Sequence, residues 1–151
     1  MYMIQNYVQL IYRIMEYGKA QDIVRTCGEG DIYKINDIPD LDYPIFWVAS
    51  TQGHVEHTNY TKYNLTLYYV DRQLIDTDSE HNDDNAMIIS AGMSILSNTI
   101  KMIKNDDDVY SVDDNIVYNT FIASDGVFND KCAGVYCNVS VNVPNYSTCV
   151  E

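Results

Sequence analysis

Apolar and polar residues alternate strictly over the C-terminal segment 135–143. The apolar side chains all fall at odd positions: Val135, Cys137, Val139, Val141 and Val143. The even positions between them hold Tyr, Asn, Ser and Asn. Because successive side chains of a strand point to opposite faces of a sheet, this pattern predicts a strand with one buried face. The segment therefore indicates a fold built on a β-sheet.

Three further segments predict strands. Residues 45–49 form a short apolar run, which is typical of a strand buried on both faces. Residues 63–72 and 116–122 show the two-residue period of a half-buried strand. The positions that share one face in these two segments are Leu65, Leu67 and Tyr69, and Ile116, Tyr118, Thr120 and Ile122.

Two segments have the spacing of three and four residues that predicts amphipathic helices. The first covers residues 2–17 and is followed by Gly18, a residue common at helix ends. The second covers 84–104 and has two lysines in its last turn, where positive charge suits the helix dipole. The expected inner faces are Ile4, Val8, Ile11 and Met15, and Ile89, Met93, Leu96, Ile100 and Ile103.

The remaining segments predict turns and loops. Residues 22–35 contain Gly28 and Gly30 and indicate a turn between two short extended pieces. The polar segments 51–62 and 72–83 predict long loops that could reach neighbouring molecules. The element order then gives strands joined without helices between them, which usually pair antiparallel. We expect a single α+β domain over residues 1–151, with a mainly antiparallel sheet of four or more strands and two helices on one face.

The charge of the chain limits its partners. It holds 22 acidic and 9 basic residues, for a formal net charge of −13. This excludes a basic groove for nucleic-acid phosphates and disfavours binding to an anionic membrane. The N-terminus lacks the features of a signal peptide, and no segment is expected to be apolar enough to span a membrane. We expect a protein that is made and kept in the cytosol.

Candidate chemistry is sparse. The spacings of Cys27, Cys132, Cys137 and Cys149 give no Cys-x-x-Cys pair, so the cysteines are interpreted as packing residues. The acidic segment 76–81 lacks the glycine that a calcium loop needs at its sixth place. His54, Glu56 and His57 lie close in sequence, but their spacing differs from that of a zinc-protease motif. We therefore predict no catalytic, cofactor-binding or metal-binding residue, and no enzyme.

Several segments carry a further pattern. Residues 43–48 form one candidate strand, and residues 64–72 form a second that ends in Asp-Arg. The helix 84–104 follows an acidic loop, residues 128–135 lead into the last strand, and Val143-Pro144 is followed by Cys149. In these features the chain resembles the tail-terminator and neck-ring (head–tail connector) proteins of tailed bacteriophages, of the crAss-like phage type. The likeness is to the first two core strands of that family, its second helix, its lead into the final strand and its ending.

The resemblance implies a structural virion protein that forms a six- or twelve-fold homo-oligomeric ring and joins the portal or head to the tail. It implies neighbouring portal, neck or tail proteins as partners, no membrane, and assembly in the cytoplasm of the bacterial host. Genomic DNA would pass through the lumen without specific binding, which the acidic composition favours. Two alternatives stay open: a non-virion adaptor or binding module of the same fold, and a small metal-dependent enzyme that uses His54 and His57.

Overall fold

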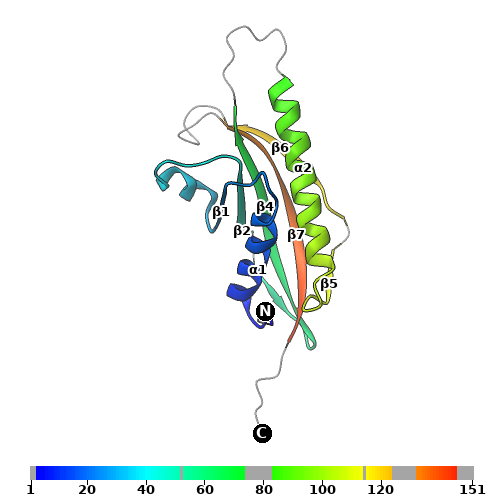
Figure 1. Ribbon diagram of the computed structural model, residues 1–151. Coiled ribbons are helices and arrows are strands. Elements are labelled where there is room, and N and C mark those ends of the chain that lie inside the picture. Colours follow the sequence, from blue (N-terminus) through cyan, green and yellow to red (C-terminus); the bar gives the residue numbers. More distant parts are fainter. Residues whose placement is uncertain (1–2, 52, 74–82, 114, 124–131, 146–151) are drawn as a thin grey trace.

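The computed structural model describes residues 3–51, 53–73, 83–113, 115–123 and 132–145 (Figure 1). Its elements in chain order are helix α1 (Tyr7–Lys19), strand β1 (Thr26–Glu29), the 3-10 helix η1 (Ile32–Asp37), strands β2 (Ile45–Ser50), β3 (Val55–Glu56) and β4 (Tyr60–Arg72), helix α2 (Asp83–Lys104), and strands β5 (Ser111–Val112), β6 (Tyr118–Ala123) and β7 (Cys132–Pro144).

The strands form one sheet in the order β1-β2-β4-β7-β5. Strand β3 pairs with β4. Strands β5 and β6 pair with different parts of the same edge of β7: β5 with residues 141–142 and β6 with residues 132–137. The pair β1–β2 is parallel, and the other described pairs are antiparallel. Both long helices lie on the same side of the sheet (Figure 1). The prediction of an α+β fold with a mainly antiparallel sheet is confirmed.

The centre of the sheet is the long antiparallel pair of β4 and β7, which are 13 residues each. Their register runs from Tyr60 opposite Pro144 to Arg72 opposite Cys132. The predicted parity of the last strand is confirmed, since its odd positions from 135 to 143 are all buried in the core beneath the helices. Apolar residues of β4 lie opposite them, as Leu65 does opposite Val139.

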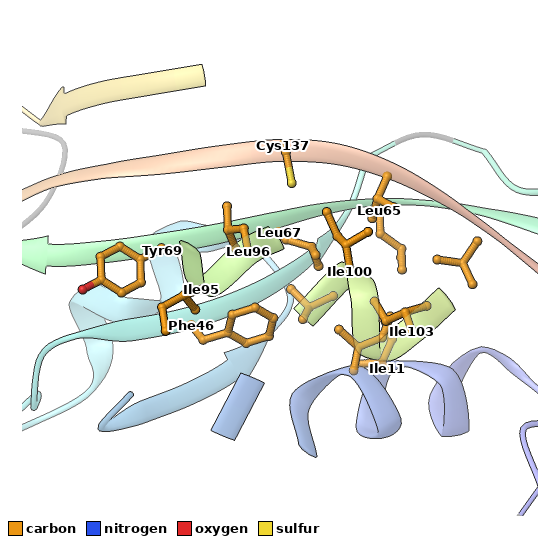
Figure 2. Packing of buried hydrophobic residues seen from close by; sticks show 14 of the residues in the cluster. Ile11, Phe46, Leu65, Leu67, Tyr69, Ile95, Leu96, Ile100, Ile103 and Cys137 are labelled. Atoms are coloured by element: carbon orange, nitrogen blue, oxygen red, sulfur yellow. The ribbon is translucent and has the colours of Figure 1, made fainter. Parts of the chain in front are cut away.

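The main core fills the space between this sheet face and the two helices. Figure 2 shows Phe46, Leu67 and Cys137 of the sheet pointing toward side chains of α1 and α2. Burying such side chains contributes about 1.5–3 kcal/mol each relative to leaving them in water. The helices therefore depend on the sheet for most of their stability.

Helix α1 differs from its prediction in both its bounds and its face. It begins at Tyr7, where the Asn6 side chain caps it by accepting a hydrogen bond from the Gln9 N–H at 2.9 Å. Val8 was expected to face inward but is 54% exposed, whereas Leu10 and Ile14 are fully buried. The expected inner face was wrong at Val8, because spacings of three and four residues fit more than one stripe on a short helix.

Gly18 lies inside α1 rather than after its end. A Cβ atom at this position would lie 2.3 Å from the Phe46 ring. The glycine is therefore required because the helix backbone approaches the sheet closely here, and not because the helix ends.

Helix α2 matches its predicted bounds, although Met93 is 41% exposed and Ile95 is buried in its place. By length and composition alone, residues Asn85–Lys104 could cross a membrane, with a mean hydropathy of 1.4. The expectation that no segment is long and apolar enough to span a membrane was therefore wrong by length and composition. One face of the helix packs into the core instead, as core helices commonly do.

The opposite face of the sheet is covered in part by η1 and the segment that follows it. Ile35 of η1 packs against Ile45, Trp47 and Val70 of the sheet in a second, smaller core. The Trp47 indole N–H donates to the Gly30 carbonyl oxygen at 3.0 Å. The prediction for residues 22–35 was wrong in its details. The turn expected at residues 28–30 lies largely within β1, which begins after the expected first piece at Ile23 and Val24, and the expected second piece at Ile32 and Tyr33 is helical.

The loop predicted over residues 51–62 is largely a hairpin. Val55 pairs with Lys62 and Glu56 with Thr61, so β4 begins at Tyr60 rather than at residue 63. The strand predicted over 116–122 begins at Tyr118, and Ile122, the last of the residues expected to share one face, is 59% exposed. Most of the other predicted loop, 72–83, lies outside the described residues.

Candidate assembly surfaces

The two histidines that were considered for metal binding have aromatic neighbours. The His54 ring centroid lies 5.1 Å from that of Tyr7 and 5.2 Å from that of Tyr63, and its Nδ1 accepts a hydrogen bond from the Asn64 N–H at 3.2 Å. His57 stacks on Tyr60 with a centroid distance of 4.5 Å. Within the described part of the chain, no group of three or more His, Cys, Asp or Glu side chains could hold a metal ion.

The cysteines with described positions are packed against apolar surface. Cys132 and Cys137 are buried and Cys27 is partly buried, and none of the three forms a disulfide. Burial raises the pKa of the Cys137 thiol to about 12 and that of Cys27 to about 11, although Lys19 opposes the second shift. Thiols with such pKa values are poor nucleophiles at neutral pH. Cys149 lies outside the described residues.

A buried ionic cluster joins α1 to the turn after α2. The Arg13 side chain is 2% exposed, and its guanidinium lies 2.6 Å from an Asp106 carboxylate oxygen and 3.1 Å from Asp108. The Tyr17 hydroxyl donates to the same oxygen of Asp106. Although burial alone would raise it, the pKa of Asp106 is lowered by the hydrogen bonds from Tyr17, the Asp108 N–H and Arg13.

This cluster was missed by the sequence analysis. The signal that could have found it is an arginine on the same helical stripe as Leu10 and Ile14, since a charged residue on an inner face requires a buried partner. The partner itself is 93 residues away in the sequence, so the pairing could not be read from local spacing. The cluster fixes α1 to the C-terminal end of α2.

A cavity of about 470 Å³ lies between the start of α2 and the end of β4. Asp71 lines it, and burial raises the pKa of this carboxyl although hydrogen bonds from the Arg72 N–H and the Tyr69 hydroxyl oppose the shift. The wall is otherwise mostly apolar and includes Met87 and Ile88 of α2. A carboxyl in apolar surroundings is a common feature of functional sites and of structural ones alike. Here it has Tyr69 as a hydrogen-bond partner inside the fold.

The polar face of β7 does not meet the helices, which lie on the other side of the sheet. It pairs across the strands instead: the Thr66 hydroxyl donates to the Asn138 side-chain oxygen at 2.8 Å, and the Ser140 hydroxyl donates to that of Asn64 at 2.7 Å. Tyr136 lies beside the small core under η1, with its ring centroid 5.7 Å from that of Tyr68. These bonds between side chains strengthen the central strand pair.

The charged residues of α2 lie only in its first and last turns, at Asp83, Asp84, Lys101 and Lys104. Residues 85–100 contain no charged side chain, although only the inner half of this stretch is needed for the core. Met87 is 67% exposed and Met93 is 41% exposed. The exposed positions between and beside them are small or uncharged: Ala86, Ser90, Ser94 and Asn98.

These features define an α+β domain with two helices on one sheet face and an uncharged stretch on the outer side of α2. Comparison with known proteins finds no family model that matches the chain and no curated protein with a similar sequence.

Proposed function

We propose that this chain is a structural virion subunit that assembles into a closed ring in the neck or tail of a tailed phage. In this role it joins the portal or head to the tail and conducts DNA. The observation that carries the proposal is the uncharged outer face of α2. Large apolar side chains on that face, Met87 and Met93, are exposed in the isolated subunit. Interface cores are depleted of charge and enriched in methionine, so this face is typical of a contact with protein.

The acidity of the chain supports the DNA-conducting role. Each copy has a formal net charge of −13. A ring of such copies repels phosphate across its lumen, so DNA passes without being retained. The residue pattern that resembles phage ring proteins supports the same function.

Mass photometry and negative-stain imaging of the purified protein test the proposal. A chain of 17.3 kDa gives particles of about 104 kDa for six copies and about 208 kDa for twelve. We expect one of these masses and annular particles. A protein that stays monomeric up to high concentration would contradict the proposal.

A matched pair of substitutions links assembly to α2. Met93→Glu places a charge on the outer face of the helix, whereas Val55→Glu places the same charge on the β3 hairpin, where Val55 is 46% exposed. We expect the first to reduce the population of large particles and the second to leave it unchanged. Equal effects of the two would show that α2 has no special part in assembly.

The same face also suits an adaptor that binds a different protein, which is the second candidate function. A ring subunit and an adaptor differ in the oligomeric state of the purified chain. A ring subunit oligomerises by itself, whereas an adaptor stays monomeric until its partner is present. The mass measurement therefore separates them.

A further inference from the structure

Strand β6 presents an unprotected edge. It pairs with β7 on one side, and no other described strand lies along its other side. The segment 115–123 contains no charged residue and no proline. Val117 is 68% exposed and Ile122 is 59% exposed. Proteins usually guard exposed edges with charges, prolines or bulges, because unpaired N–H and C=O groups pair readily with another chain.

At the opposite edge of the sheet, a groove of about 690 Å³ lies between α1 and the edge strand β1. Its floor is mainly apolar. The residues that form it include Tyr12 and Met15 of α1, and Val24, Thr26 and Cys27. Figure 1 shows that β1 and β6 lie at opposite sides of the subunit.

The outer edge of β1 is available for hydrogen bonding. The N–H groups of Thr26 and Gly30 donate inward to Pro44 and Val48, at 3.3 and 2.9 Å. Because residues of a strand alternate between its two edges, the N–H and C=O groups of Cys27 and Glu29 point outward. No strand lies beside them within the described residues.

Charge favours β6 of another copy as the occupant of this groove. The rim carries Lys19 and Arg25 beside Glu16, in a chain with only 9 basic residues. The uncharged segment 115–123 is flanked along the sequence by acidic residues: Asp113, Asp114 and Asp125. Asp113 forms an exposed ion pair with Lys62 at 3.1 Å, so the charge complementarity rests on Asp114 and Asp125. A neutral strand with acidic ends matches an apolar groove with a basic rim.

We propose that β6 of one copy adds to the β1 edge of the next, with the exposed Ile122 side chain, which lies on the helix side of its sheet, in the groove beside α1. Such a contact joins different surfaces of two identical subunits, so it propagates head to tail and closes into a ring when the rotation allows. This assignment rests on the proposed function, since it names the contact between subunits of the ring. Main-chain hydrogen bonds supply affinity in strand addition, and pockets for alternate side chains supply specificity.

Site-specific photocrosslinking tests the contact directly. A photoreactive benzoylphenylalanine replaces Ile122 in a mixture of isotopically light and heavy protein, and mass spectrometry locates the crosslinked peptide. We expect light–heavy crosslinks from position 122 to residues 12–27 of another copy. The same probe at Val55, also exposed, should give none to that segment.

A charge on the β6 edge gives an independent measurement. Ile122→Lys adds the kind of guard that edge strands usually carry. We expect the concentration at which the ring dissociates to rise about tenfold or more, as loss of a well-buried contact produces. Circular dichroism and thermal unfolding of the dissociated variant should match the wild type, because Ile122 is exposed within the subunit.

The outcomes separate this contact from the ring itself. Annular particles whose crosslinks from position 122 avoid residues 12–27 would overturn the strand-addition contact and leave the ring proposal standing. Assembly unchanged by Ile122→Lys would do the same. A wild-type protein that never oligomerises would overturn both.

Discussion

Replacing Asp106 by Asn tests how much the buried ionic cluster stabilises the fold. The substitution keeps the shape of the side chain and removes its charge. Arg13 would keep Asp108 at 3.1 Å, but it would lose the closer carboxylate at 2.6 Å. The buried guanidinium would then have only one carboxylate partner in place of two.

The expected loss follows from the position of the pair. Both side chains are less than 5% exposed, so solvent screens their attraction weakly. Removing one partner of a buried pair typically costs about 3–5 kcal/mol. Because Asp108 remains, we expect a loss near the lower end, about 3 kcal/mol, which corresponds to a fall in Tm of roughly 6–12 °C for a domain of this size.

Urea unfolding followed by circular dichroism measures the effect. Asp107→Asn is the matched control, since it makes the same charge change at the next residue, which is exposed; we expect it to stay within about 0.5 kcal/mol of the wild type. The double variant Arg13→Met with Asp106→Asn should be more stable than Asp106→Asn alone, because the deeply buried guanidinium is removed as well, while Asp108 is 22% exposed and stays in contact with solvent. If Asp106→Asn and Asp107→Asn had the same stability, the cluster would not hold the helices together.

The pH dependence has a definite sign. Despite the opposing effect of burial, hydrogen bonds and the Arg13 charge lower the pKa of Asp106 in the folded state. A depressed folded pKa contributes stability that is complete above the unfolded pKa of about 4 and is lost as pH falls through the lower folded value. The difference in stability between the wild type and Asp106→Asn should therefore be constant near neutral pH and shrink below about pH 4.

Three further substitutions or measurements test the packing. Val139→Asp should lower the free energy of unfolding by about 4 kcal/mol or more, because it buries a charge in the core. Asn138→Asp on the exposed side of the same strand should cost much less, because aspartate keeps the oxygen that accepts from the Thr66 hydroxyl; equal Tm values for the two would show that the facing of β7 is wrong. Gly18→Ala should cost about 1–3 kcal/mol by overpacking against Phe46, and a denaturation midpoint at or above that of the wild type would contradict the close approach. Cys137, whose pKa burial raises to about 12, should react with iodoacetamide at about pH 8 only after unfolding, so peptide mapping that finds it alkylated in the native protein would refute its burial.

The strands were predictable because their signal is local. In β7 every second residue from Val135 to Val143 is apolar, and the period of a strand does not depend on distant contacts. The pairing of β7 with β4 was not predicted, because α2 separates them in the chain and only strands joined without a helix were expected to pair. The parallel pairing of β1 was not predictable, since Thr26–Glu29 is too short to show a period.

The helix faces were less predictable because they depend on tertiary contacts. Val8 and Met93 fit an apolar stripe by spacing, yet each lies at its edge and faces outward. Arg13 breaks the stripe of α1 by sequence, yet it is buried because Asp106 neutralises it. A helix in isolation carries no information on where such a partner lies, so periodicity alone places the face only to within about one residue.

Two uncharged surface stretches of this acidic chain are not explained by folding. Folding requires apolar residues on the inner face of α2 and on the core side of the sheet. It sets no such requirement on the outer positions of residues 85–100 or on the free edge of 115–123, yet both stretches are without charge. In a chain with a net charge of −13, copies repel one another unless their contact surfaces are neutral or complementary. Neutral outer surfaces on α2 and β6, together with basic residues at the groove beside β1, meet the conditions that the proposed ring requires.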